Sequence, residues 1–154
     1  MEIKKAQLGI IGSILLMFGT LVPIVSVPIA GSQNYFQNGN GGGLIVIALG
    51  LAGIAFVVAK KFQALIPLGI ATAALTTFTL VSVLIRISDA KSQLEASLEG
   101  NPFAGLAAGI MNSVQIEWGW LVLYLSAAAL ISSGVMARRE SQKSDEPQPP
   151  QDRI

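Results

Sequence analysis

Four long apolar stretches without a single charged side chain dominate the sequence and restrict what it can fold into. They cover residues 8–29, 44–59, 64–85 and 118–137. A helix needs about 20 apolar residues to cross the roughly 30 Å hydrocarbon core of a bilayer, so the first, third and fourth are long enough. The second, with 16 residues, reaches only about 24 Å. Glycines before it and a snorkelling Lys60 after it can extend this short span. We therefore expect an all-α integral membrane protein, with residues 1–137 forming a four-span transmembrane domain.

Basic residues cluster at alternate ends of these stretches. The clusters are Lys4–Lys5, Lys60–Lys61, and Arg138–Arg139 with Lys143. The segment between the first two spans has no Lys or Arg, and residues 86–117 carry two basic side chains against four acidic ones. Because cytoplasmic loops are enriched in Lys and Arg, this pattern predicts a multi-pass protein of the cell (inner or plasma) membrane with both termini in the cytoplasm.

The composition excludes several classes of function. The chain has no Cys and no His, which removes thiolate and imidazole ligands, the thiol nucleophile and the imidazole base, and leaves an enzyme only Asp, Glu, Lys, Ser or Thr. Only 12% of residues are charged, against about 25% in a soluble domain, which excludes an ordinary soluble globular protein. A net charge of +1 does not provide the positively charged surface that binds nucleic acid. Glu117 alone does not make a catalytic site. We therefore expect no enzyme activity, no cofactor and no metal.

Small residues recur at helical spacing in the apolar stretches, where they allow close approach of membrane helices. A spacing of three and four residues favours a left-handed four-helix bundle. The residues expected to pack the helices are Gly9, Gly12, Gly19, Gly50, Gly53, Gly69, Thr72, Thr76 and Thr79. The three threonines have two interpretations. They could line a path for a small solute, or their hydroxyls could bond to their own helix backbone and add only packing. No ionisable residue marks a path, which favours packing.

The two segments between spans on the predicted outer side differ in pattern. Residues 31–43 are rich in Gly and Asn and predict turns without a regular element. In the outer segment 86–117, span three should continue as a helix to Gly100, and an amphipathic outer-side helix should follow near residues 102–115. Its apolar stripe consists of Phe103, Leu106, Ile110, Met111 and Val114. The other face is small and barely charged, unlike a helix lying on lipid. This helix either covers its own bundle or docks a partner subunit.

The remaining signals concern the ends of the spans. Pro23 predicts a kink in the first helix, and Trp118 and Trp120 are expected to be interfacial anchors at the start of the fourth. Residues 138–154 are charged and proline-bearing, which predicts a disordered cytoplasmic tail.

The segment Gly100-Asn101-Pro102-Phe103-Ala104-Gly105, followed by Glu117-Trp118-Gly119-Trp120, resembles uncharacterised small bacterial four-span (tetraspan) membrane proteins over about a third of the chain. The resemblance implies no activity. Claudin-like tetraspans share the topology, but their paired cysteines and Trp-Gly-Leu-Trp motif in a long first outer loop are absent.

These observations lead to two functional hypotheses. The first is a non-catalytic structural or assembly subunit, embedded in the lipid bilayer, that works by helix packing and its outer helix in a homo-oligomer or with other membrane subunits. The alternative is a channel or transporter for a small neutral solute, with Thr72, Thr76 and Thr79 along the path. A membrane enzyme would need an acidic pair such as Glu99 and Glu117 to converge.

Overall fold

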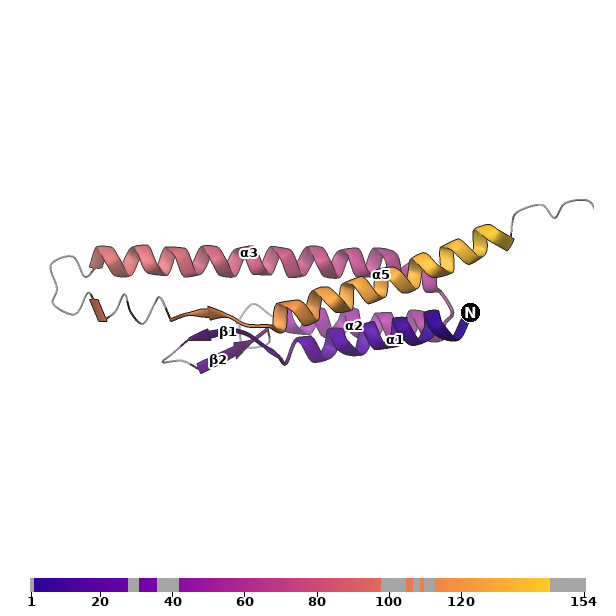
Figure 1. The fold of residues 1–154 in the computed structure, drawn as a ribbon, viewed down its shortest axis with the longest axis horizontal. Helices are drawn as coiled ribbons and strands as arrows, with labels where there is room; N and C mark the ends of the chain where they lie inside the picture. Colours follow the sequence, from indigo (N-terminus) through magenta and orange to yellow (C-terminus); the bar gives the residue numbers. More distant parts are fainter. Residues whose placement is uncertain are drawn as a thin grey trace, which may run out of the picture.

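The computed structural model describes residues 2–27, 31–35, 42–97, 105–106, 109 and 113–144. Within these ranges the chain forms four long helices and a small sheet at one end of them (Figure 1). The helices are α1 (Glu2–Gly19), α2 (Gly42–Val58), α3 (Leu65–Ser97) and α5 (Gly119–Ser144), and a short 3₁₀ helix η1 (Phe62–Ala64) leads into α3. The chain is thus mostly helical, in agreement with the sequence.

Two helical segments are long and apolar enough to cross a membrane, Phe62–Leu94 and Gly119–Lys143. The helix Gly42–Val58 is apolar but shorter. α1 includes the charged residues Glu2, Lys4 and Lys5. By length and composition, the described residues therefore contain two clear candidate spans rather than the four that were expected.

The sheet corrects the expectation for residues 20–34. β1 (Pro23–Val27) pairs antiparallel with β2 (Gly31–Asn34) and with β3 (Gln115–Ile116), in the order β2-β1-β3. The predictions of a helix up to residue 29 and of no regular element after Gly31 are therefore wrong here.

The physical reason for the early end of α1 lies in its last turn. Pro23 has no amide proton and its ring would clash with the carbonyl of Gly19 in a continuing helix. Thr20 and Leu21 instead close a turn, with Leu21 N donating to Phe18 O at 2.9 Å and the Thr20 hydroxyl donating to Met17 O at 2.7 Å. The β-branched residues that follow suit an extended strand. The helix thus stops where a kink was expected.

The C-terminal helix also differs from expectation. α5 continues to Ser144, so residues 138–144 are helical and not disordered. Lys5 and Glu140 form an ion pair at 2.5 Å, and the Gln63 amide donates to the Ser141 hydroxyl at 3.4 Å. These contacts fix the last turns of α5 to α1 and η1. Residues 145–154 lie outside the described part of the chain.

The same contacts show how the helices are oriented. They bring the beginning of α1, the turn between α2 and α3, and the end of α5 to one end of the molecule, which we call the inner end. The sheet lies at the other, outer end, and α3 extends beyond the sheet on that side (Figure 1). α5 packs against α1 and α3, and α2 packs mainly against α1. The core between them is formed by side chains that are fully buried: Leu16, Val46, Leu65, Leu123 and Leu130.

Candidate functional site

No group of three or more Asp, Glu, His or Cys side chains that could hold a metal occurs among the residues that the structure describes. The polar side chains that are fully buried there are hydroxyls: Ser13, Thr20, Thr72, Thr76, Ser126 and Ser133. The features that could serve a function therefore lie at the two ends of the bundle and on its helix interfaces.

At the outer end, Trp120 joins the sheet to the helices. Its indole Nε1 donates to the Ile24 carbonyl at 3.0 Å, and the same carbonyl accepts the Glu117 amide at 3.0 Å. The ring of Tyr35 meets the Trp120 ring edge-on, with the centroids 6.0 Å apart. The Tyr35 hydroxyl donates to Thr79 Oγ1 of α3 at 2.5 Å. We call Ile24, Tyr35, Thr79 and Trp120 the outer joint, because they connect β1, the end of β2, α3 and α5.

The outer joint changes the interpretation of the two tryptophans. Trp118 is 61% exposed, as an interfacial anchor would be, whereas Trp120 is only 5% exposed. The reason is that the Trp120 N–H finds its acceptor in the protein instead of the headgroup region. Burial raises the pKa of the Tyr35 phenol above its ordinary value, and the hydrogen bond to Thr79 opposes this only in part. The sequence pattern did not reveal this joint, because Tyr35 stands in a polar loop far from Trp120.

The structure describes only two of the five candidate docking residues, Leu106 and Val114. Phe103, Ile110 and Met111, and most of the expected helix 102–115, lie outside the described residues. Leu106 is helical and 69% exposed. Val114 is partly buried and packs against the core, so it faces its own bundle. Gln115–Ile116 form β3, so the described chain is extended at that point.

The glycines chosen from the sequence lie at helix contacts. A Cβ added to Gly9, Gly19 or Gly50 would come within 2.8 Å of a side chain on another helix. At Gly12 the nearest atoms include the backbone of Leu130 and Ser126, each at 3.2 Å, and Gly53 lies against Ser13. At Gly69, Ile131 Cγ1 would lie 2.6 Å away. Gly134, which the spacing argument missed, sits equally close to α3: its Cβ would lie 2.5 Å from Ile66 Cγ1.

The three threonines of α3 do not behave alike. Thr72 donates to Leu68 O at 2.9 Å, and Thr79 donates to Leu75 O at 3.0 Å while accepting from Tyr35. Thr76 is fully buried, and its hydroxyl has no partner among the described residues. Two of the three hydroxyls are therefore bound to their own helix, as expected for a packing role.

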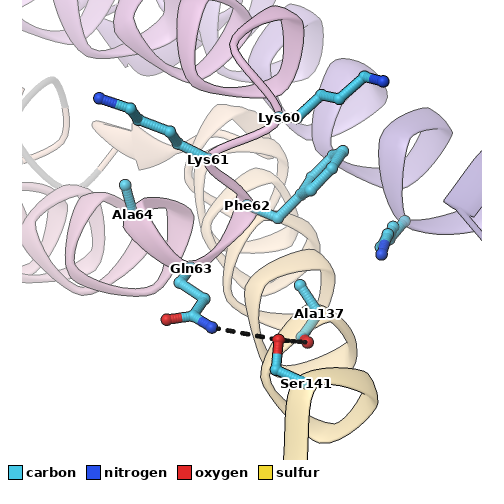
Figure 2. Close-up of a pocket in the computed structure, with 8 residues that line it drawn as sticks. Lys60, Lys61, Phe62, Gln63, Ala64, Ala137 and Ser141 are labelled. Atoms are coloured by element: carbon cyan, nitrogen blue, oxygen red, sulfur yellow. Dashed lines mark hydrogen bonds between the residues drawn. The ribbon is translucent and has the colours of Figure 1, made fainter. Parts of the chain in front are cut away.

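At the inner end, a pocket of about 410 Å³ opens beside the turn between α2 and α3 (Figure 2). Its lining includes Lys5, Lys60, Lys61, Phe62, Gln63 and Ser141. We call it the inner pocket. The Lys5 ammonium lies 5.2 Å from the centre of the Phe62 ring and pairs with Glu140, and the Lys5 carbonyl accepts the Ser133 hydroxyl at 2.7 Å. The sequence had marked these lysines only as signals of orientation.

No family model matches the chain, and neither a curated protein nor a solved structure shows significant similarity to it.

Proposed function

We propose that this chain is a non-catalytic, four-span protein of the cell membrane that serves as an assembly subunit, either in a homo-oligomer or with other membrane proteins. Two spans are assigned to α3 and α5, which are long and apolar enough to cross a membrane. The proposal adds α1 and α2, which pack against each other and, through α1, against α5. The Lys-bearing inner end then faces the cytoplasm, in accord with the positive-inside rule.

The observation that carries the proposal is the outer joint. It fixes the sheet to the helices through two side-chain hydrogen bonds and a ring contact, so the outer layer is a rigid extension of the bundle. Beyond it, Leu106 and Ile116 are 69% and 50% exposed. Exposed apolar side chains that gather into one contiguous patch are typical of a protein contact, and the proposal places Leu106 and Ile116 in such a patch.

The second hypothesis, a channel for a small neutral solute, has one observation in its favour, the buried Thr76 hydroxyl that lacks a partner in the described chain. The test is to replace Thr72, Thr76 and Thr79 together by Val and to measure the flux of water, glycerol and urea in proteoliposomes. Flux that is lost in the triple variant supports the channel, and unchanged flux removes it.

The assembly proposal is tested by photo-crosslinking in native membranes. A photoreactive amino acid is placed at position 106 or 116, and a matched control is placed at Ser32, which is exposed on the polar strand β2. We expect one adduct of discrete mass from positions 106 and 116, lost when the other of these two residues is changed to Asp, and none from position 32. If both positions label only lipid, and the protein remains monomeric in mild detergent, the proposal is wrong.

A further inference from the structure

The inner pocket carries an excess of positive charge. Lys5 faces the carboxylate of Glu140, so this pair adds no net charge. Lys60 and Lys61 have no carboxylate within salt-bridge distance in the described chain. Figure 2 shows their side chains leaving the turn on opposite sides, with the Phe62 ring on the same side as Lys60. Flexible four-carbon stems let two ammonium groups turn toward one anion.

The backbone at Lys60 gives an independent reason to assign a role to its side chain. The Lys61 amide donates to Phe56 O at 2.8 Å and the Lys60 amide donates to Val57 O at 3.0 Å. These two bonds are the Schellman pattern that ends a helix, and Lys60 occupies the position that is usually Gly. Its φ is 57°, and no other non-glycine residue in the described chain has a positive φ. A left-handed conformation is unfavourable for a residue with a Cβ. The lysine at this position therefore destabilises the turn relative to a glycine.

The position of the inner pocket indicates which kind of anion could bind to its lysines. It begins directly after the last apolar turn of α2, which ends at Val58, at the level where a bilayer would present its headgroups. Gln63 and Ser141 add an amide and a hydroxyl at the rim, both exposed. Basic pockets between helices on the cytoplasmic side are known to accept anionic headgroups.

We infer that the inner pocket binds the phosphate of an anionic phospholipid headgroup through Lys60 and Lys61, with the second N–H of the Gln63 amide as a neutral hydrogen-bond donor. Binding would hold the turn between α2 and α3 at the membrane surface. The inference requires that the inner end lies at the bilayer surface, but it does not depend on whether the protein assembles with partners.

The test is native mass spectrometry of the full chain in mild detergent, titrated with phosphatidylglycerol or with phosphatidylcholine of identical acyl chains. We expect one phosphatidylglycerol to bind in preference to phosphatidylcholine. A lysine near an anionic surface contributes about fivefold in affinity, so the double variant Lys60→Gly, Lys61→Gln should bind phosphatidylglycerol roughly 30-fold more weakly. The control is Lys143→Gln, which removes a charge from the last turn of α5 outside the pocket and should bind normally.

The single variant Lys60→Gly distinguishes a loss of lipid affinity caused by the missing ammonium group from a loss caused by misfolding. Because Gly relieves the left-handed strain, this variant should melt at the same temperature as the natural protein or above it while it loses affinity. Unchanged lipid affinity in the double variant, equal loss in Lys143→Gln, or equal binding of both lipids would each overturn the inference. Binding of glycerol 3-phosphate as tight as that of the lipid would show a site for a soluble phosphate ester, and the assignment to lipid would then be wrong.

Discussion

Gly69 lies where α3 crosses α5, and its replacement by Ala tests how closely the two helices must approach. The new Cβ would lie 2.6 Å from Ile131 Cγ1, 3.0 Å from Ala127 O and 3.1 Å from Ile131 N. The Ile131 side chain can rotate away, but the two backbone atoms cannot. The helices must therefore separate by a few tenths of an ångström along this contact.

The expected magnitude combines two opposing terms. Overpacking a well-filled interface costs about 1–3 kcal/mol, whereas Ala stabilises a helix interior by about 1 kcal/mol relative to Gly. The net expectation is a loss of about 1 kcal/mol in the free energy of unfolding. The control is Ala71→Leu, which adds volume on the exposed face of the same helix, keeps a strong helix former and should change stability by less than about 0.5 kcal/mol.

The assay is reversible unfolding in mixed micelles, followed by circular dichroism. A double-mutant cycle with Ile131→Ala should recover less than half of the loss, because the backbone contacts remain. If Gly69→Ala is neutral or stabilising, the interface relaxes freely and the reasoning about close approach is refuted.

Three further predictions concern the two ends of the bundle. Trp120→Phe should lower the free energy of unfolding by about 1 kcal/mol through the lost bond to Ile24, and a loss no larger than that of Trp118→Phe, measured in the same micelles, would contradict the outer joint. Because the pKa of Tyr35 is raised, the folded state favours the neutral phenol. Its contribution is complete below the ordinary value near 10 and is lost as the pH rises further, so alkaline titration at 295 nm should show a late transition that is absent from Tyr35→Phe. Glu140→Gln removes the carboxylate that faces buried Lys5 and should lower the free energy of unfolding by about 1–3 kcal/mol. This is less than the loss expected for a fully buried ion pair, because Glu140 is partly exposed to solvent. A melting temperature equal to that of the natural protein would argue against a stabilising ion pair.

The helices were predictable from sequence because their apolar runs are long and the glycine spacing marks the close contacts. The sheet was not. Its first strand, Pro23–Val27, continues an apolar run, so hydropathy alone cannot separate it from a membrane helix. The useful signal was the β-branched stretch bounded by Pro23 and Pro28, which is typical of a strand. The second strand, Gly31–Asn34, has low strand propensity and forms because β1 offers it a partner.

The two ends were predictable to different degrees. The lysines at the inner end stood out as charges, but the pairing of Lys5 with Glu140 joins residues far apart in the chain, and no local pattern encodes it. At the outer end, the same is true of Trp120 with Ile24 and of Tyr35 with Thr79. Local periodicity specifies which face of a helix is apolar, whereas these bonds depend on which elements become neighbours after folding.

α3 extends over 33 residues, which corresponds to a rod of about 50 Å. In the proposed embedding, its inner end is fixed by the η1 turn, and a hydrocarbon layer of about 30 Å leaves some 20 Å of the rod standing in the outer aqueous phase. Because the outer joint also holds α3 at Thr79, the free arm is the part from there to Ser97, about 27 Å long. A bend of about 10° at the outer joint would move its tip by roughly 5 Å. Small rearrangements at the outer joint would thus be enlarged at the tip of α3, away from the membrane.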